Sequence, residues 1–525
     1  MPQREEKLLE DAAIKLGQRN YREAHAACLE ALRLNPRSAQ GFYLLGVLTA
    51  DHTNHTKALE LFDRALALSP ANAIYLAERA RSRIALFDRE GALEDARAAA
   101  TGERLSARTL DTIGVVHSRI GRHSDATPFF QRAVEKEPGN PSFLYNLGSA
   151  LQFEGSFGKA EMIFRKALSI EPGNVRAWSS LVLMLRQTKE RNDIATLETL
   201  FSKLTEADDK LHIGHALAKA NEDLGNTRDT MKWLSEAKAL KRMSASHDAS
   251  EIDALFAAAA ETVRSFESPA GLTATDAPIF VVGLPRTGTT LVDRILSSHD
   301  QVISAGELSD FALETKRATG TPSSFVLDAD TLCAAAGIDP AAVGKSYLAR
   351  ASHVVGAAPR FVDKMPLNFF YAALILRALP NARIICLRRN PADSILSNYR
   401  QLFATSFTYY AYAYDLEWTA AFYARFDALI AACREHLPAD RFTEVAYEDL
   451  ISNLQNEARR LVAFCDLDWQ EQCLAFHENA APVATASSSQ VRQPLYSTSM
   501  NRWQRYRESL QPALDVLTAR GVPFE

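Results

Sequence analysis

The chain has 525 residues, more than one hydrophobic core usually supports, so we expect two or more domains. Its hydrophobic fraction of 47% is typical of a globular protein, and its formal net charge of -5 gives no general electrostatic attraction to nucleic acid. Any anion-binding site must therefore be local.

The cysteines and the opening residues both favour a protein of the cytoplasm. The six cysteines include no C-x-x-C pair and no zinc-like spacing, so we expect reduced, mostly structural thiols. The residues from Met1 to Lys7 lack an apolar stretch, and no run in the chain approaches the ~18 apolar residues of a membrane span. We therefore expect a cytoplasmic protein without a membrane span.

Small residues recur every 34 residues through the first third of the chain. Two alanine series begin at Ala24 and Ala31 and continue in this step to Ala160 and Ala167. A third small position and an aromatic position keep the same step, and prolines close four of the five units. A helix-turn-helix period of this length resembles the tetratricopeptide repeat.

We expect residues 1–247 to form a tetratricopeptide-repeat array, with five clear repeats and two degenerate ones after Pro172. Each repeat buries its apolar face against its neighbours, which produces a superhelix with a concave groove. Such grooves usually bind peptides, so the expected partner is a peptide or protein acceptor. Two alternatives stay open, a spacer or a contact between the subunits of a homodimer.

The remainder of the chain has the pattern of an α/β domain. Residues 248–277 have the composition of a junction, and residues 278–525 form the second expected domain. Strand-like runs alternate with helical segments there, which predicts a mainly parallel sheet covered on both faces. The runs are residues 279–283, 360–363, 383–387 and 441–446. Ligands bind beyond the carboxyl ends of such strands, where the polar loops after the first three runs can converge.

The first of these loops has the features of a phosphate site. Gly283 and Gly288 permit close backbone approach, and the following helix offers unpaired N–H groups and a partial positive charge. Both glycines and Thr290 match the Walker pattern G-x-x-x-x-G-K-[ST], but Thr289 replaces the lysine and Arg286 lies inside the loop. The missing lysine argues against triphosphate hydrolysis and for another phosphate-bearing ligand. A plain strand-to-helix turn is the alternative.

The stretch Leu284-Pro-Arg-Thr-Gly-Thr-Thr290 resembles the 5′-phosphosulfate loop of sulfotransferases that use PAPS (3′-phosphoadenosine 5′-phosphosulfate), above all the tyrosylprotein branch. The resemblance implies a P-loop-like fold. It also implies cofactor contacts from Pro285, Arg286, Thr287, Gly288, Thr289 and Thr290. Animal tyrosylprotein sulfotransferases are membrane-anchored and lumenal, so the resemblance does not extend to localisation.

Two further loops resemble this family in chain order. Glu307 follows Gly306 at the distance where the tyrosylprotein branch carries its catalytic base, which takes the proton of the acceptor hydroxyl. His299 is a weaker candidate for this base. Lys364, in Lys364-Met-Pro, matches a lysine beside the oxygen that bridges phosphate and sulfate, where a cation offsets leaving-group charge. A helix cap and a surface lysine are the alternative roles.

The loop from Leu387 to Arg400 resembles the 3′-phosphate loop of the family. There an arginine, an Asn-Pro or Asp-Gly pair, and a serine eight residues after the arginine clamp the 3′-phosphate, which implies Arg389 and Ser397 here. Arg388 and Arg400 are further candidates.

Three later positions complete the resemblance. Tyr447 matches a segment that bounds the nucleotide pocket, and Ser488, in Ser487-Ser-Ser-Gln-Val, matches a serine that touches the sulfuryl group. Arg502 matches a lysine that contacts the cofactor; the charge is kept but the geometry differs. The aromatic residues between positions 403 and 423 are expected mainly to pack.

Five motifs in family order between residues 278 and 505 predict a PAPS-dependent sulfotransferase that needs no metal and releases adenosine 3′,5′-bisphosphate. Glu307 would deprotonate the acceptor, while Arg286, Lys364 and Ser488 would stabilise the developing charge. The expected acceptor is a tyrosine in a protein or peptide. Alternatives are a carbohydrate or small hydroxyl compound as acceptor, a non-catalytic nucleotide-sensing adaptor built on the repeats, and a kinase.

Overall fold

The computed structural model of the protein describes residues 2–245, 247–268, 275, 277–323, 325–356, 358–405, 408–479 and 499–525. The chain forms two compact units, Met1–Met184 and Leu185–Glu525. The first unit is helical, and the second combines helices with a five-stranded parallel sheet. The expected combination of a helical-repeat region and an α/β domain is confirmed.

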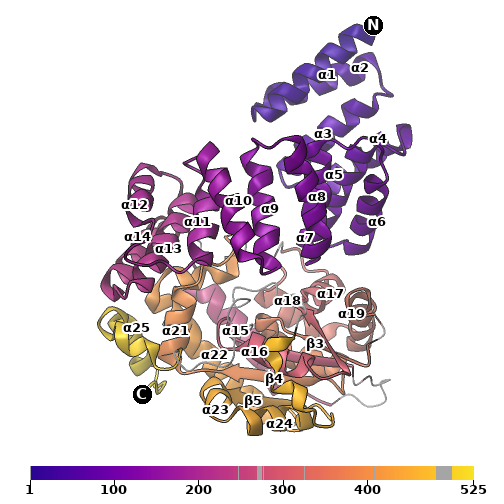
Figure 1. The fold of residues 1–525 in the computed structure, drawn as a ribbon. Coiled ribbons are helices and arrows are strands. Elements are labelled where there is room, and N and C mark those ends of the chain that lie inside the picture. Colours follow the sequence, from indigo (N-terminus) through magenta and orange to yellow (C-terminus); the bar gives the residue numbers. More distant parts are fainter. Residues whose placement is uncertain are drawn as a thin grey trace. The chain divides into compact units, whose positions relative to one another are not determined.

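Antiparallel hairpins build the first unit, each packed against the next (Figure 1). Its helices are α1 (Pro2–Gly17), α2 (Tyr21–Leu34), α3 (Ala39–Asp51), α4 (His55–Leu68), α5 (Ala73–Ala85), α6 (Arg89–Ala100), α7 (Ala107–Arg119), α8 (His123–Lys136), α9 (Pro141–Phe153), α10 (Phe157–Ile170) and α11 (Val175–Met184).

In three of these hairpins, a glycine of the first helix faces a buried phenylalanine of the second. A Cβ added at Gly148 would lie 2.7 Å from Cε1 of Phe164, so only glycine lets the two helices approach this closely. The other two pairs are Gly46 with Phe62 and Gly114 with Phe130. The 34-residue period of the sequence therefore reflects a glycine–phenylalanine contact that recurs from hairpin to hairpin.

The helix boundaries follow the same step. Four side chains accept a backbone N–H at the start of a hairpin and cap its first helix: Ser38, Asn72, Ser106 and Asn140. The turn inside each hairpin holds one residue with positive φ: Arg19, Thr53, Phe87, Gly121 and Gly155. Both series are signals of the repeat that small and aromatic residues alone do not carry.

The second unit begins with helices α12 (Ile194–Lys203), α13 (Ala207–Asp223), α14 (Thr227–Ser244) and α15 (Ala249–Arg264). The ring of Phe256 in α15 lies 4.8 Å from that of Phe370 and 5.1 Å from that of Phe422, centroid to centroid. This helix is therefore part of the core of the second unit. The compact units divide at residue 184, ahead of α13 and α14, whereas the repeat array expected from the sequence runs to residue 247.

The parallel sheet lies at the centre of the second unit. Its strands are β1 (Pro278–Gly283), β2 (Val302–Gly306), β3 (Arg360–Asp363), β4 (Arg383–Arg388) and β5 (Phe442–Ala446). Their order is β2-β3-β1-β4-β5, so β1 lies between two strands that follow it in the chain. The four strands expected from the sequence are present. The short edge strand β2 was not expected, because it buries only Val302 and Ala305 and shows no strand pattern.

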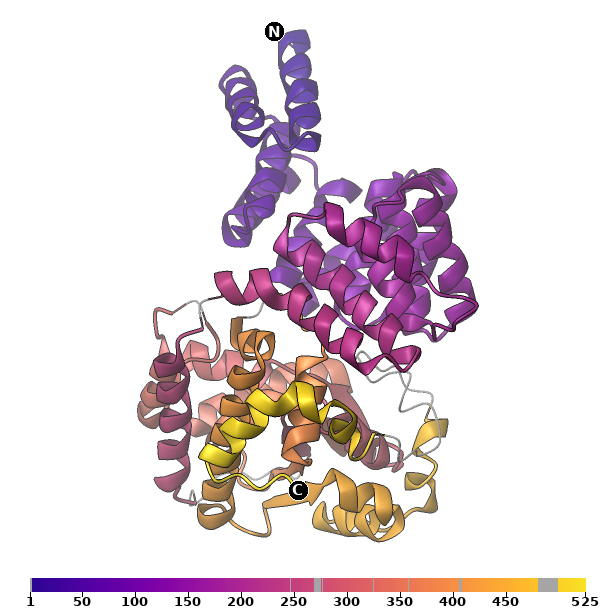
Figure 2. The ribbon, with the colours of Figure 1, turned by 90° about the vertical axis from the view of Figure 1, so that its left-hand side faces the viewer.

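Helices cover both faces of this sheet. Phe280 and Val282 of β1 pack in one core with residues of α15, α22 and α25, while Ile279 and Val281 pack in a second core with residues of α16 and α24. The helix α25 lies across α21 and α22 (Figure 2).

The helices that follow β1 in the second unit are α16 (Thr289–Ser297), α17 (Asp310–Thr319), α18 (Ala329–Ala334), α19 (Pro340–Val355), α20 (Ala372–Ala378), α21 (Pro391–Tyr399), α22 (Leu416–His436), α23 (Tyr447–Ser452), α24 (Leu454–Phe464) and α25 (Arg507–Ala519). Short 3-10 helices are η1 (Ala335–Gly337), η2 (Pro366–Tyr371), η3 (Thr408–Tyr414), η4 (Glu471–Cys473), η5 (Phe476–Glu478) and η6 (Arg502–Tyr506). Among the described helices, none has the length and apolar character that crossing a membrane requires.

Candidate functional site

The first polar loop leaves β1 directly beside β4. Gly283 is paired with Leu387 in the sheet and has a φ of 139°. A Cβ at this position would lie 2.6 Å from the backbone oxygen of Leu387, so a side chain does not fit. Glycine is therefore needed for the close approach of the loop to the neighbouring strand.

The same loop ends at a second constrained glycine. Gly288 has a φ of 104°, and a Cβ there would lie 2.6 Å from Cδ2 of Tyr447. Arg286 also has a positive φ, 68°, and the hydroxyl of Thr287 donates to the backbone oxygen of Leu284 at 2.7 Å. The loop is thus tightly wound, lies against Tyr447 at the end of β5 and leads into α16. Thr289 and Thr290 begin that helix and are buried.

Arg389, at the end of β4, joins the first loop to the carboxyl-terminal part of the chain. Its Nη1 donates to the backbone oxygen of Arg286 at 3.1 Å, and its Nη2 donates to the backbone oxygen of Ser499 at 2.5 Å. The guanidinium carbon lies 4.8 Å from the centre of the Tyr447 ring, a cation–π distance. Three residues that the sequence nominated from separate motifs, Arg286, Arg389 and Tyr447, therefore lie together.

A second hydrogen bond joins the loop after β1 to the segment that follows β4. Nδ2 of Asn398 donates to the backbone oxygen of Pro285 at 2.9 Å, and the hydroxyl of Tyr412 donates to Oδ1 of Asn398 at 2.8 Å. Ser397 precedes Asn398 in α21 and is half-buried. Asn398 lies inside the motif but was not predicted to have a role, because an amide at a helical position has no distinctive sequence pattern.

Lys364 and Glu307 form an ion pair at the ends of β3 and β2. The Lys364 side chain is 2% exposed and the Glu307 side chain is 42% exposed. The backbone N–H of Lys364 also donates to the backbone oxygen of Gly306 at 2.8 Å. The sequence nominated these residues from motifs far apart, and the sheet brings them together with the cation buried and the carboxylate accessible.

The buried carboxyl group of Asp363 lies next to Lys364 in the chain and holds the segment that follows Glu307. Asp363 accepts a hydrogen bond from the Tyr347 hydroxyl at 2.9 Å and from the backbone N–H of Leu308 at 3.3 Å. Burial raises the pKa of Asp363 to about 8, against the effect of these two hydrogen bonds. Asp363 therefore fixes the segment that carries Glu307 to the strand that carries Lys364.

Asp293 is a second buried carboxyl group that the sequence analysis did not single out. It lies in the first turns of α16, and its Oδ1 has no hydrogen-bond partner among the described residues. Burial raises its pKa, and the charge of Lys364 opposes the rise. A single aspartate after the Thr289-Thr290 pair carries no sequence signal, so only the fold shows its nearness to Lys364.

Aromatic rings lie near the carboxylate of Glu307. Burial raises the pKa of the Tyr409 phenol to about 12, and the negative charge of Glu307 adds to the rise. Burial also raises the pKa of Tyr410, with smaller contributions from Tyr409 and Glu307, and the Tyr410 ring stacks on that of Phe403 with centroids 4.3 Å apart. These rings were expected mainly to pack, and they do; the charge of Glu307 also reaches two of them.

The remaining nominated residues lie elsewhere or outside the description. The Arg502 side chain is ion-paired with Glu222 of α13 at 2.6 Å. Ser488 falls outside the described residues. The weaker candidate base, His299, is buried, with Nε2 2.9 Å from the backbone oxygen of Asp468 and Nδ1 3.2 Å from the backbone nitrogen of Gln301. Both of its ring nitrogens are therefore occupied in structural contacts.

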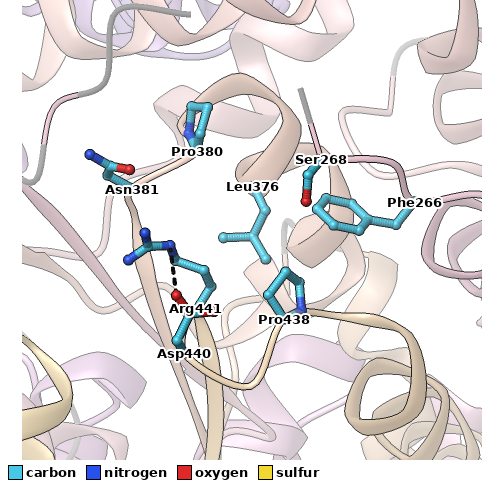
Figure 3. A pocket seen from close by; sticks show the side chains of 8 residues that line it. All are labelled: Phe266, Ser268, Leu376, Pro380, Asn381, Pro438, Asp440 and Arg441. Atoms are coloured by element: carbon cyan, nitrogen blue, oxygen red, sulfur yellow. Dashed lines mark ion pairs between the residues drawn. The ribbon is translucent and has the colours of Figure 1, made fainter. Parts of the chain in front are cut away.

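A small pocket of about 260 Å³ lies at the other end of the strands from the nominated residues (Figure 3). Pro380 and Asn381 precede β4, and Asp440 and Arg441 precede β5, so this pocket lies at the amino ends of the strands. The nominated residues gather at the carboxyl ends, where parallel sheets usually bind ligands. The pocket is therefore separate from the candidate site.

Residues 278–471 match the sulfotransferase family, and residues 12–73 and 141–174 match the tetratricopeptide repeat. The second unit thus carries a sulfotransferase-family domain, with the parallel sheet and phosphate-type loop described above. The first unit carries tetratricopeptide repeats.

Several relatives of the sulfotransferase region are named protein-tyrosine sulfotransferases. The protein-tyrosine sulfotransferase of Drosophila melanogaster is 25% identical over 244 residues, which are 43% of this chain and 46% of that protein. Protein-tyrosine sulfotransferase A of Caenorhabditis elegans is 24% identical over 253 residues, 46% of this chain and 64% of that protein. An uncharacterized protein of Aquifex aeolicus is 29% identical over 413 residues, 75% of this chain and 52% of that protein. The chain spans about half the length of the Aquifex and Drosophila proteins.

Proposed function

We propose that the protein transfers a sulfuryl group from PAPS to the hydroxyl of a tyrosine in a protein or peptide. The observation that carries this proposal is the ion pair between the buried Lys364 and the exposed Glu307. It lies at the same ends of the strands as the loop after β1 and the loop after β4, which a hydrogen bond from Arg389 to Arg286 joins. A site that only sensed a nucleotide would need neither a base nor a cation for a leaving group. This disfavours the adaptor alternative, and Thr289 in place of the Walker lysine disfavours a kinase.

The donor would bind across the two loops. The loop from Leu284 to Gly288 and the start of α16 would hold the 5′-phosphosulfate, and Arg389 with Ser397 would hold the 3′-phosphate. The hydrogen bonds from Arg389 to Arg286 and from Asn398 to Pro285 support this division, because they keep the two loops at a constant separation before the donor arrives.

The chemistry would be an in-line transfer. Glu307 takes the proton of the acceptor hydroxyl, whose oxygen then forms a bond to sulfur while the bond between sulfur and the phosphate oxygen breaks. Adenosine 3′,5′-bisphosphate leaves with the electron pair, and Lys364 and Arg286 offset the charge that develops. The salt bridge between Glu307 and Lys364 supports this assignment, because it holds the two side chains at one site.

The aromatic residues favour a phenolic acceptor over a sugar. Phe403 stacks on Tyr410, Tyr409 lies edge-on to Tyr410, and the charge of Glu307 acts on Tyr409; an aromatic ring gains from packing against such a group. The repeats of the first unit support a protein acceptor, because a peptide bound by them would have a high effective concentration for a site on the same chain. A carbohydrate or small hydroxyl compound is the second candidate.

Donor binding is tested by calorimetry with adenosine 3′,5′-bisphosphate in the absence of magnesium. We expect binding by the natural protein and a loss of about 10- to 100-fold in affinity for Arg389→Ala, the size of a lost charge-assisted contact. Arg434→Ala is the matched control, because Arg434 is an exposed arginine of α22 that is ion-paired with Glu444 and has no part in the proposed site. Equal affinity of the two variants, or binding that requires magnesium, would contradict the proposed donor site.

Transfer is tested with radiolabelled PAPS and a panel of tyrosine peptides, simple phenols and glycans. Glu307→Gln should keep its affinity for adenosine 3′,5′-bisphosphate while turnover falls by about 10²- to 10⁴-fold, as for a lost general base. A variant with nearly natural turnover would exclude Glu307 as the base. Label on glycans alone would replace the tyrosine acceptor by the second candidate.

A further inference from the structure

The hairpin of α13 and α14 is fastened to the sulfotransferase-family domain through buried polar groups. Nζ of Lys238 in α14 donates to the backbone oxygen of Ala413 at 2.6 Å and also to that of Tyr399. Lys238 is buried, and its ammonium group lies over the ring of Tyr399. The helices α13, α14 and α21 lie close together in this unit (Figure 1). These repeat-like helices therefore contact the end of α21, which carries Ser397.

Glu222, near the end of α13, is the centre of a second buried cluster. Its carboxylate is ion-paired with Arg502 at 2.6 Å and with Arg400, and it accepts a hydrogen bond from the Tyr506 hydroxyl at 2.7 Å. The Glu222 side chain is 10% exposed. Burial favours its neutral form, but the charges of Arg400 and Arg502 outweigh burial, and the pKa of Glu222 is lowered.

The two arginines belong to the two segments that border Arg389. Arg400 directly follows α21, whose Asn398 holds the first phosphate-type loop. Arg502 begins η6, three residues after Ser499, whose backbone oxygen accepts from Arg389. One carboxylate thus ties together both sides of the proposed 3′-phosphate site.

The charges of the cluster do not cancel. Two guanidinium groups share one carboxylate, so the three side chains carry one net positive charge next to the place proposed for the 3′-phosphate. A positive charge held there attracts a phosphate, and Arg502 is the more exposed of the two arginines, at 29% against 22%. Its orientation depends on Glu222, since no other ion pair of Arg502 is found among the described residues.

We propose that Glu222 is a positioning residue of the nucleotide site, which makes the hairpin of α13 and α14 part of the cofactor-binding machinery. It holds Arg400 and Arg502 on either side of Arg389, so that Arg502 faces the bound nucleotide. The inference rests on the proposed function. Without the carboxylate the two guanidinium groups repel each other, and the more exposed Arg502 turns toward solvent.

The test is a double-mutant cycle on the affinity for adenosine 3′,5′-bisphosphate, measured by calorimetry on the full chain. Glu222→Gln keeps the size of the side chain and removes its charge, and we expect a dissociation constant about tenfold higher. Arg502→Ala should have a similar effect, and the double variant should bind no more weakly than Arg502→Ala alone. In transfer assays KM for PAPS should rise in the same ratio, while kcat changes little.

Two further variants separate positioning from folding. Arg242→Gln removes another ion pair between α14 and this domain, that with Asp415 at 3.1 Å, and should leave the affinity unchanged. Glu222→Asp keeps the charge on a shorter side chain and should raise the dissociation constant only about threefold. If Glu222→Gln does not fold, Glu222→Asp decides the question, and an unchanged affinity of this variant contradicts the proposal.

The outcomes distinguish this inference from the proposed function. If the natural chain does not bind adenosine 3′,5′-bisphosphate, the donor assignment itself is wrong. If the natural chain binds but Glu222→Gln binds equally well, Glu222 does not position the site. If the effects of Glu222→Gln and Arg502→Ala add in full, Glu222 does not act through Arg502, which also overturns the proposal.

Discussion

The repeat hairpins of the first unit and the hairpin of α13 and α14 differ in where the partners of their buried polar groups lie. The repeats pack rings beside glycines, as with Phe164 and Gly148, and their buried carboxylates Glu78 and Asp95 pair with arginines of the same unit. The later hairpin buries an ammonium group, Lys238, and a carboxylate, Glu222, whose partners all lie in the sulfotransferase-family domain or next to it. Helical hairpins of similar outward pattern can therefore belong to different folding units. The partners of their buried polar groups decide which unit each one joins.

Cutting the chain on either side of the hairpin of α13 and α14 should have the largest effect. A chain that begins at residue 185 keeps α13 and α14, whereas one that begins at residue 246 leaves Arg400, Arg502 and two backbone oxygens without their partners. We expect cooperative thermal unfolding from the first and little folded protein from the second, since two arginines and two backbone oxygens lose their partners together. Equal stability of the two chains would contradict the assignment of the hairpin to the second unit.

Within the repeats, the largest effect should come from removing an interlocking ring. Phe164→Ala should lower the free energy of unfolding of the first unit by about 3–5 kcal/mol, because it opens a cavity beside Gly148. Hydrogen exchange followed by mass spectrometry should show the loss in α9 and α10. Faster exchange in the sheet of the second unit as well would show that the two units unfold together.

Lys238→Met should destabilise the second unit by about 2 kcal/mol. Two backbone oxygens lose their donor, but the cost of burying an ammonium group is removed at the same time. The net loss of stability should therefore be smaller than the loss caused by the cavity in Phe164→Ala. Lys232→Met is the matched control, since Lys232 is exposed on the same helix. Chemical unfolding of the two variants measures the difference, and equal midpoints would mean that Lys238 contributes nothing.

The smallest predicted effect is a pH dependence that differs between the units. Burial raises the pKa of Asp111 in the first unit to about 6 and that of Asp363 in the second to about 8. An acid with a raised pKa in the folded state stabilises fully below its unfolded pKa, about 4, and this contribution is lost as pH rises through the folded value. The first unit should therefore lose this contribution between about pH 4 and pH 6, and the second should go on losing it up to about pH 8.

Asp363→Asn tests this directly, because the amide cannot ionise. The difference in unfolding free energy between the natural protein and the variant should shift in favour of the variant as the pH is raised from 5 to 9, values that bracket the pKa of about 8. A difference independent of pH would mean that Asp363 does not hold its proton in the folded protein.

The sequence predicted those parts of the molecule that repeat or that follow a buried strand. The 34-residue step identified the hairpins, and the loops after β1, β3 and β4 identified Arg286, Lys364 and Arg389, which the structure gathers at one edge. Strand β2 was missed because it has only five residues, and its two buried residues, Val302 and Ala305, do not alternate with exposed ones as in a typical strand.

Contacts between distant segments were beyond sequence reasoning. Asn398 and Asp293 are single polar residues on helices, and nothing in their neighbourhood indicates that one holds a backbone oxygen and the other lies near Lys364. Glu222 lies 178 residues before its partner Arg400. Only the packing of α13 against the domain shows that this carboxylate pairs with two arginines.

The left-handed turns of the repeats have a consequence for how the first unit opens. Glycine occupies this conformation without strain at positions 121 and 155, whereas Arg19, Thr53 and Phe87 adopt it at a cost of about 1–2 kcal/mol each. In a linear array, each hairpin contributes its own stability plus that of its contacts with its neighbours. The array should therefore fray from its amino-terminal end, so that a protease added to the native protein cuts first near the turns at Arg19 and Thr53 and leaves the glycine-turned hairpins intact.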